Sequence, residues 1–401
     1  MPSTLHPARA HALPARPYIV DIVPARSHLA LRHPEPEITL ADRETLQGVL
    51  ALSGHSAPVT AVCADSSIWS AGKDARVVRW DERTRRPAAE ITAHLRKPLP
   101  LSALALNEQA NLVVGGTECV SSESHILFWD VRQTSSPVYR HSSTHSDEIT
   151  HLSFLPSLPS LQSGPSGPSA LLLSASVDGT LAVSDVTESD EEEAVHAAAN
   201  WNASIAGASV YTWSGGARVW ARSDMDTLAS WALCVGEEGL ELSALHEVAS
   251  AQFKARDIGG LRTEYLVTAA PSLGVGPAGA PVVAAGTNDG AVVLEYNAGK
   301  GYEATAVLRG AHEDVVRCLY HAPVDGALYT GSEDGVLAGW AIGGLALQTG
   351  ADGERDERGE RESQQNEHKQ EAAEMDVDTA RDTRERQSRK EKRQRKRHAP
   401  Y

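Results

Sequence analysis

Short segments in which apolar and polar residues alternate recur along most of this chain. The stretch 59–62 is one example, and a Gly-Lys-Asp turn at 72–74 follows soon after it. Alternation with a period of two is typical of half-buried β-strands, and Gly, Asn and Asp between such segments favour tight hairpins. The pattern therefore predicts many short antiparallel strands.

The same order of residues returns at a regular spacing. Four copies are clear, at 54–81, 94–130, 145–185 and 312–340. Each starts with a histidine, and each ends at or near a Trp-Asp pair, which is degraded to Val-Ser-Asp in the third copy and to Gly-Trp in the last. Weaker copies occupy 18–40, 209–233 and 265–296. Seven units in roughly 345 residues agree with the ~40–45 residues of a propeller blade plus loop insertions. The expected fold is all-β, a seven-bladed β-propeller.

The recurring His, Asp and Trp side chains predict a structural brace in each blade. A buried indole needs a hydrogen-bond partner for its N–H, which a hydroxyl or an imidazole can supply. A catalytic His–Asp pair is the alternative interpretation, but a catalytic site is needed once and these residues recur. We assign this structural role to His55, Asp74, His94, His145, Asp178, Asp289, His312, Asp334 and Trp340.

The composition predicts three regions. Residues 1–17 are rich in proline and are expected to be a flexible N-terminal segment, residues 18–345 form the propeller, and residues 346–401 form a disordered charged tail. Two further stretches, at 156–169 and 274–281, are rich in small residues and predict surface loops. An acidic run at 188–193 is expected to be a solvated loop, with a docking site for a basic peptide as the alternative.

The net charge of −16 lies entirely in the first 350 residues, which hold 23 Lys/Arg and 39 Asp/Glu, whereas residues 351–401 hold 14 of each. An acidic body does not suit broad binding to nucleic-acid phosphates, but it suits a basic protein partner. The alternative is that the negative charge only keeps the protein soluble and binds no partner.

The four cysteines have no paired spacing, so buried free thiols in a reducing compartment are expected. The spacings of the histidines match no zinc pattern, and no phosphate-binding glycine loop or nucleophile elbow is present. We therefore expect no metal, no cofactor and no catalytic residue. No apolar stretch reaches the roughly 20 residues of a membrane span, and the proline-rich N-terminus does not resemble a secretory signal.

The tail ends in a basic run with seven cations in nine residues. Such a run predicts a nuclear import signal or a nucleic-acid-binding arm. The alternative is a solvated tail that binds nothing. Import is favoured because no aromatic residue is interleaved for base stacking. The import receptor would bind Arg389, Lys390, Lys392, Arg393, Arg395, Lys396 and Arg397.

With these repeats in place, the chain resembles the WD-repeat proteins over roughly residues 18–345. The resemblance is carried by the Gly-His and Trp-Asp pairs at 54–55 and 80–81, by the segments 145–150 and 174–179, and by the segment 331–335. It implies a non-enzymatic propeller that is nuclear, with a cytoplasmic share, and it implies no substrate.

A narrower motif, Trp-Asp-x-Arg, closes two consecutive repeats. It resembles the box by which some WD-repeat substrate receptors bind the damaged-DNA-binding adaptor of cullin–RING ubiquitin ligases. The two arginines would lie just past the third strand of adjacent blades and could pair with carboxylates. Arginine in this position can equally pair with local acids. The residues of this candidate adaptor site are Trp80, Asp81, Arg83, Trp129, Asp130 and Arg132.

Three function hypotheses follow. The first is a nuclear scaffold that presents one face and the mouth of its central channel to a protein partner. The second is a substrate receptor of a ubiquitin ligase. A propeller hydrolase is the weakest, because no non-repeating cluster of carboxylates and histidine is present.

Overall fold

A computed structural model describes residues 2–156, 170–236, 239–275, 279–297, 299–323 and 325–342. The described residues form one compact unit. Of the predicted loop at 156–169 only residue 156 is described, and the whole of the predicted charged tail lies outside the described residues.

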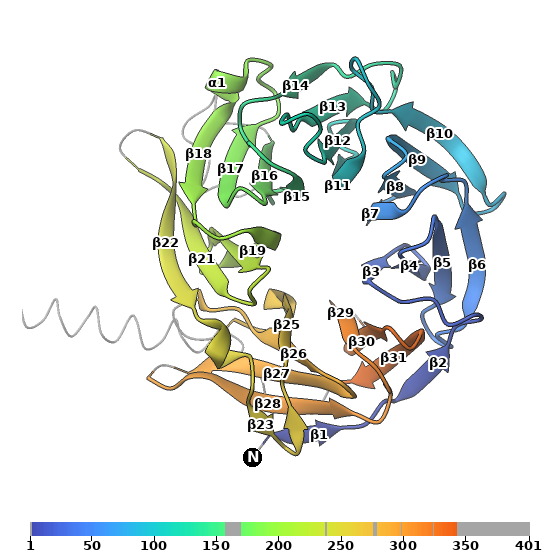
Figure 1. Cartoon of the computed structure of the whole chain (residues 1–401), viewed down its shortest axis with the longest axis vertical. Coiled ribbons are helices and arrows are strands. Elements are labelled where there is room, and N and C mark those ends of the chain that lie inside the picture. Colours follow the sequence, from blue (N-terminus) through green and yellow to red (C-terminus); the bar gives the residue numbers. More distant parts are fainter. Residues whose placement is uncertain are drawn as a thin grey trace, which may run out of the picture. The chain divides into compact units, whose positions relative to one another are not determined.

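Seven antiparallel sheets are arranged around a common centre, so the predicted seven-bladed β-propeller is confirmed (Figure 1). In blades 1–5 the strands follow chain order from the inside of the ring to its rim. The first three blades contain β3 (Asp21–Pro24), β4 (His28–Arg32), β5 (Glu37–Asp42), β6 (Gly48–Ser53); β7 (Val59–Ala64), β8 (Ile68–Gly72), β9 (Arg76–Asp81), β10 (Arg86–Thr92); and β11 (Leu101–Asn107), β12 (Leu112–Thr117), β13 (Ile126–Asp130), β14 (Tyr139–His141).

Blades 4 and 5 follow, and blade 5 has the longer outer strand of the two. Their elements are β15 (Ile149–Phe154), β16 (Leu171–Ser176), β17 (Thr180–Asp185), α1 (Glu191–Ala194), β18 (Val195–Asn200); and β19 (Ile205–Trp213), β20 (Gly216–Ser223), β21 (Leu228–Val235), β22 (Leu240–Val248). An insertion then holds two 3₁₀ turns and a small hairpin around the start of blade 6, namely Ser250–Gln252, β23 (Asp257–Ile258), β24 (Leu261–Arg262) and Pro271–Leu273.

The last two blades are completed by the N-terminus. Blade 6 contains β25 (Tyr265–Ala269), β26 (Val283–Thr287), β27 (Gly290–Asn297), β28 (Gly301–Arg309), and blade 7 contains β29 (Val316–Ala322), β30 (Ala327–Ser332), β31 (Val336–Ala341). β1 (Ser3–Leu5) pairs in parallel with β28, and β2 (Arg9–Ala12) pairs antiparallel with β31 as the fourth strand of blade 7.

The expectation of a flexible segment over 1–17 was therefore wrong. The prolines at 2, 7, 14 and 17 hid the two strands, but they lie outside both strand ranges, where they remove no ladder hydrogen bond. Blade 7 has only three strands of its own before Ile342, so a distant segment must cover β31. The N-terminal segment supplies that strand and closes the ring.

The hydrophobic core is divided among the seven blade interfaces. Seven buried clusters can be distinguished among the described residues, and each joins two neighbouring blades. The cluster between blades 7 and 1, for example, packs Ile19 and Leu29 against Leu337. Both faces of an inner strand are thereby buried, which explains why β8, β16 and β30 are apolar or small throughout.

A bulge near the start of the innermost strand recurs in six of the blades. In blades 2 and 3 the bulge residue has a hydroxyl side chain that is turned toward the next blade. Thr60 Oγ1 donates to the carbonyl oxygen of Leu101 at 2.7 Å, and Ser102 Oγ donates to that of Ile149, also at 2.7 Å. These bonds link neighbouring blades around the inside of the ring.

Candidate protein-interaction site

The brace is most complete in blade 2. Trp80 Nε1 lies 2.8 Å from Ser70 Oγ, Ser70 Oγ lies 2.8 Å from His55 Nε2, and His55 Nδ1 lies 3.0 Å from Asp74 Oδ1. An indole N–H can only donate and a carboxylate can only accept. Trp80 therefore donates to Ser70, and His55 donates to Asp74.

Blade 7 repeats this arrangement with a threonine. Trp340 Nε1 donates to Thr330 Oγ1 at 2.9 Å, His312 Nε2 lies 2.7 Å from the same oxygen, and His312 Nδ1 lies 3.8 Å from Asp334. Burial raises the pKa of Asp334, but hydrogen bonds from His312 and from the backbone amides of Glu313 and Val336 outweigh it and leave this pKa at about 2. The carboxylate thus ties the loop before the blade to its second hairpin.

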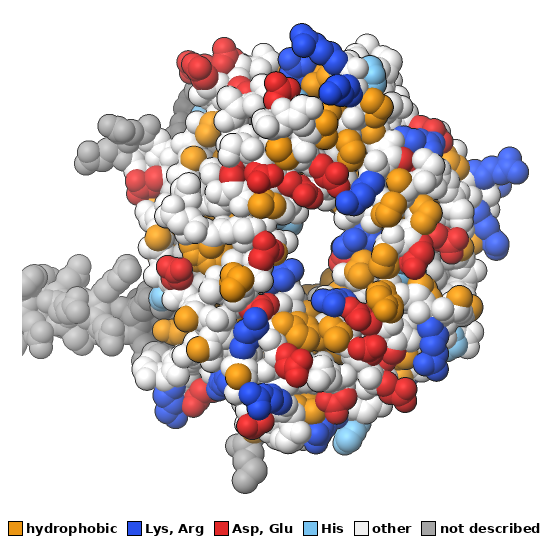
Figure 2. Space-filling view, in the orientation of Figure 1, with side chains coloured by type: hydrophobic (Ala, Val, Ile, Leu, Met, Phe, Trp, Pro, Cys, Tyr) orange, Lys and Arg blue, Asp and Glu red, His pale blue; other side chains and the backbone are white. Residues whose placement is uncertain are grey.

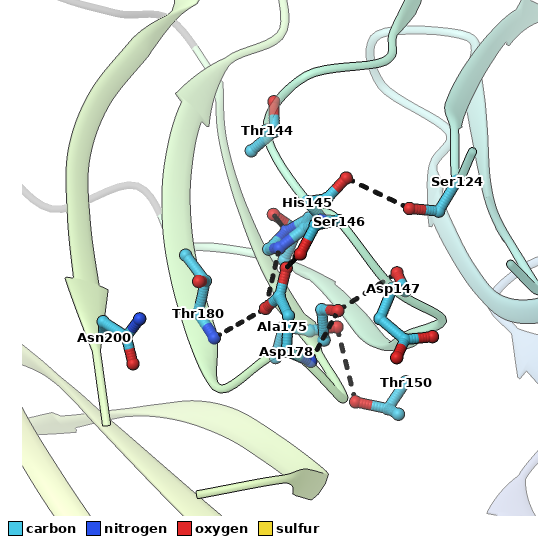
Figure 3. A network of polar contacts seen from close by, with 12 residues as sticks. Ser124, Thr144, His145, Ser146, Asp147, Thr150, Ala175, Asp178, Thr180 and Asn200 are labelled. Carbon is cyan, nitrogen blue, oxygen red and sulfur yellow. Dashed lines mark hydrogen bonds and ion pairs between the residues drawn. The ribbon is translucent and has the colours of Figure 1, made fainter. Parts of the chain in front are cut away.

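Blade 4 keeps the histidine and the aspartate and lacks the indole. His145 lies beside Asp178 (Figure 3), with 3.8 Å between its Nδ1 and the carboxylate. His145 Nε2 lies 2.7 Å from Ser174 Oγ, while Ser184 occupies the position of the tryptophan. Asp178 also accepts hydrogen bonds from the amides of Ser146 and Thr180. Because these groups contact one another within each of blades 2, 4 and 7, the structure supports a scaffold role for them.

His94 does not take part in a brace, contrary to expectation. It is exposed and lies seven positions before β11, whereas His55 lies four positions before β7. The hydroxyl position of this blade is Gly115, and the Nε1 atom of Trp129 has no hydrogen-bond partner. Blade 3 is held instead by aromatic packing, in which Tyr139 stacks on Phe128 with 4.3 Å between ring centroids.

Asp289 also differs from its predicted role. It is exposed, and its carboxylate lies 3.3 Å from Thr287 Oγ1 in its own hairpin. Leu261 occupies the position four residues before β25 where the braced blades have histidine. Blade 6 therefore lacks the donor that would hold this aspartate.

The face that carries the braces is also charged near the centre of the ring. Lys73 Nζ and Glu118 Oε1 form an ion pair at 2.8 Å between blades 2 and 3. Burial, and then the nearby carboxylate of Glu118, raises the pKa of Glu148 at the start of the inner strand of blade 4. Figure 2 shows acidic and basic side chains mingled around the central opening of the face in view.

The two Trp-Asp-x-Arg turns lie at the opposite end of the blades from the braces. In an antiparallel blade the turn after the third strand and the loop before the first strand are at opposite ends, so Arg83 and Arg132 share one face in neighbouring blades. The side chain of Arg83 is 84% exposed and lies 3.8 Å from Asp81. That of Arg132 is 72% exposed and binds Asp130 through two hydrogen bonds of 2.9 and 2.6 Å.

The Arg132 bonds hold the pKa of Asp130 at about 2. Arg83 can therefore reach a partner directly, whereas Arg132 must first leave Asp130. Trp80 and Trp129 are buried and cannot contact a partner themselves.

The acidic run after β17 is not a free loop. Glu191, the first residue of α1, accepts hydrogen bonds from the backbone amides of Ser142, Ser143 and Thr144 at 2.7–2.8 Å and from the Thr144 hydroxyl at 2.6 Å. Burial raises the pKa of Glu191, but these donors outweigh it and bring this pKa to about 2. No periodic signal in the sequence marks this contact, because its two halves lie some fifty residues apart.

All four cysteines are free thiols, and Cys318 is buried. The histidines that cluster in sequence near residue 145 have separate environments: His141 lies against Phe128, and burial lowers the pKa of His151 to about 4. Within the described ranges, no three His, Cys, Asp or Glu side chains are placed to hold a metal ion. In the same part of the chain, no helix is both long and apolar enough to span a membrane. The basic run at 389–397 lies outside the described residues.

The seven sheets and the His–Ser/Thr–Trp brace are those of a WD-repeat propeller. Comparison with known proteins agrees with that class. Over 177 residues the chain is 23% identical to an uncharacterized WD repeat-containing protein of Schizosaccharomyces pombe, covering 43% of this chain and 50% of that protein. Over 202 residues it is 27% identical to an uncharacterized WD repeat-containing protein of Saccharomyces cerevisiae, covering 48% of this chain and 46% of that protein.

The chain thus spans about half the length of the curated relatives it matches. No protein-family model matches the sequence.

Proposed function

We propose that this chain is a non-enzymatic scaffold that binds protein partners within a nuclear complex. The observation that carries the proposal is the use of the recurring polar residues: in blades 2, 4 and 7 they bond to each other, and they stiffen a ring whose loops are left to present a surface. The acidic excess of residues 1–350 favours a basic partner surface. It disfavours direct binding of nucleic acid.

The basic run from Arg389 to Arg397 supports nuclear import, with a cytoplasmic share of the protein. The test compares the location of the tagged full-length chain with that of a variant in which the seven cations of this run are replaced by glutamine. We expect the wild type to concentrate in the nucleus and the variant in the cytoplasm. Equal distributions would contradict the import signal, and an entirely cytoplasmic wild type would contradict the nuclear scaffold.

Short sequence segments within individual blades support a narrower placement within the WD-repeat proteins. The segments 145–150 and 174–179, the blade containing Trp213, and the segment 331–335 before a basic tail are similar to WD repeat-containing protein 89. We propose that placement as a refinement of the WD-repeat class.

The second candidate function is a substrate receptor of a cullin–RING ubiquitin ligase. Its support is the exposure of Arg83 and Arg132 on one face of neighbouring blades. A carboxylate of the adaptor would bind Arg83 and displace Asp130 from Arg132, since arginine forms bidentate pairs with carboxylates.

The adaptor hypothesis is tested by affinity purification of the wild type and of an Arg83→Ala/Arg132→Ala variant. Arg96→Ala/Arg140→Ala is the matched control, because both of these arginines are exposed outside the motif. We expect the adaptor to be recovered with the wild type and the control and to be lost with the Arg83/Arg132 variant. If recovery of the adaptor is undiminished with that variant, the motif has only a structural role within its blades.

A further inference from the structure

A groove of about 860 Å³ lies on the outer side of the ring at blade 1. Its length follows β6, the outermost strand of that blade. Its other walls are the segment 13–18, which links β2 to β3, and the hairpin residues 33–37 between β4 and β5. One end of the groove reaches the braced face at His55, and the other reaches the first Trp-Asp-x-Arg turn at Arg85.

β6 presents a bare backbone edge to this groove. It pairs with β5 on one side, and no strand pairs with its other side among the described residues. Proteins usually protect such an edge with charged side chains or proline, because a free row of N–H and C=O groups can pair with another chain. β6 reads Gly-Val-Leu-Ala-Leu-Ser. The fourth strands of the other six blades all contain at least one His, Arg, Lys, Asp or Glu.

Apolar side chains flank the same edge. Val49 within β6 is 48% exposed, and Tyr18 at the end of the linking segment is 49% exposed. Prolines at 14, 17, 34 and 36 form the walls, and a proline has no N–H with which to occupy the edge from within the chain. Exposed apolar surface beside an open strand edge is the chemistry of a peptide-binding groove.

This molecule already adds a strand to an outer edge elsewhere. In blade 6, β1 lies against β28 as a fifth strand, with Thr4 opposite Val307 and Leu5 opposite Leu308. The edge of β28 thus pairs with an extended segment of three residues, Ser3–Leu5, which ends in an apolar side chain. Blade 1 offers a six-residue edge with no fifth strand in place.

The charges at the two ends of the groove give it a direction. Arg85 lines the end where β6 begins, since it belongs to the turn between β9 and β10 at that end of the neighbouring blade. Glu35 and Glu37 line the end where β6 finishes, because Glu37 pairs with Ser53. Neither Arg85 nor Glu35 forms an ion pair within the described residues.

We propose that β6 is a docking edge for an extended segment of a partner protein, which adds to blade 1 as a fifth strand. The segment carries apolar side chains at alternate positions, an acidic residue at the end beside Arg85 and a basic residue at the end beside Glu35. Main-chain hydrogen bonds supply the binding, and Tyr18, Val49 and the end charges supply the selectivity. This surface goes beyond the scaffold function proposed above and does not depend on the tail or on the adaptor motif.

The test pans a phage library of short random peptides on the full-length protein, and the enriched peptides are synthesised as probes. Val49→Lys places a charge on the edge, Ala51→Lys does so two residues along, and Val138→Lys is the matched control because Val138 is 62% exposed outside the groove. We expect probes with alternating apolar residues that bind both edge variants at least about tenfold more weakly than the wild type. Binding to Val138→Lys should be unchanged.

Two further measurements locate the probe. Hydrogen exchange should slow at the amides of residues 48–53 when the probe binds, and methylation of alternate probe amides should abolish binding. Arg85→Glu should invert the preferred charge at the adjacent probe end. The proposal is overturned if no probe is enriched, if the edge variants bind as well as the wild type, or if the amides protected by the probe lie outside residues 48–53. Concentration-dependent protection of 48–53 without a probe, together with a dimer in solution, would assign the edge to a second copy of the chain and also overturn the proposal.

Discussion

At the scale of single residues, one small hydroxyl side chain decides whether a blade has a brace. Ser70 and Thr330 each accept the indole N–H of a buried tryptophan and contact a buried histidine. In blade 3 the equivalent position is Gly115, and Trp129 is left without an acceptor. The histidine and the tryptophan are conspicuous in the sequence, but the residue between them carries the connection.

Ser70→Ala should therefore destabilise the protein strongly. The substitution orphans the N–H of Trp80 and the Nε2 of His55, both buried, and the expected loss is roughly 2–4 kcal/mol in the free energy of unfolding. Chemical denaturation followed by tryptophan fluorescence measures it. Ser189→Ala, at an exposed serine, should change the same quantity by less than about 0.5 kcal/mol. Equal effects of the two changes would mean that the brace contributes no stability.

At the scale of elements, two segments that resemble loops in the sequence are anchored. The N-terminal residues form β1 and β2, and the acidic run forms α1 with Glu191 bound to three backbone amides. In both cases the partner lies far away along the chain, so local composition indicates mobility where tertiary pairing imposes order.

The N-terminal strands should contribute unequally to stability. Removing residues 2–12 strips the fourth strand from blade 7 and exposes the edge of β31, so we expect a loss on the order of several kcal/mol and a strong tendency to aggregate. Removing residues 2–6 deletes only β1 and should cost much less. Thermal unfolding and soluble yield of the two truncations measure the difference. Similar behaviour of both would argue against β2 as the strand that closes the ring.

The Glu191 contact should make stability depend on pH in the acidic range. The folded-state pKa of about 2 lies below the ordinary value of 4.5, so the stabilisation is fully present above pH 4.5 and is lost as the pH falls toward 2. Glu191→Gln removes it at neutral pH. The difference between the denaturation midpoints of wild type and variant should thus be constant from pH 7 to about 5 and shrink below pH 4.5. A difference that does not vary with pH would contradict an ionised Glu191 in this contact.

At the scale of the whole molecule, stability is distributed around a ring. Each of the seven core clusters belongs to two blades, and the bulge hydroxyls add a link between inner strands. A blade consequently has no complete core of its own, and the ring must close before any interface is fully protected.

The links around the ring can be tested together. Thr60→Val and Ser102→Ala each remove one interblade hydrogen bond of 2.7 Å and should each cost about 1 kcal/mol in unfolding free energy. The double variant should cost the sum, about 2 kcal/mol, if the links act independently, and more if loosening two consecutive interfaces weakens blade 3 as a unit. Denaturation of the two single variants and the double variant measures the coupling. No loss in either single variant would show that the bulge bonds do not hold the blades together.

The sequence by itself determined the class of fold, the number of blades and the histidines and aspartates of three braces, but not the hydroxyl residues that join them. These features repeat, and a repeated period of strands and turns survives the loss of individual residues, as in the blade that has Ser184 for tryptophan. It also suggested braces at His94 and Asp289, because a residue type at roughly the right spacing cannot reveal a three-residue insertion or a missing partner.

Only the tertiary structure decided how the ring closes, what holds the acidic run, and which outer strand edge lies beside a groove. Each of these depends on contacts between residues that lie far apart along the chain: β2 with β31, Glu191 with residues 142–144, and β6 with the segment 13–18. Local alternation and composition carry no information on such pairs, because the same short apolar strand can be covered by a neighbour or left open at the rim. The docking edge proposed at β6 is set at that level.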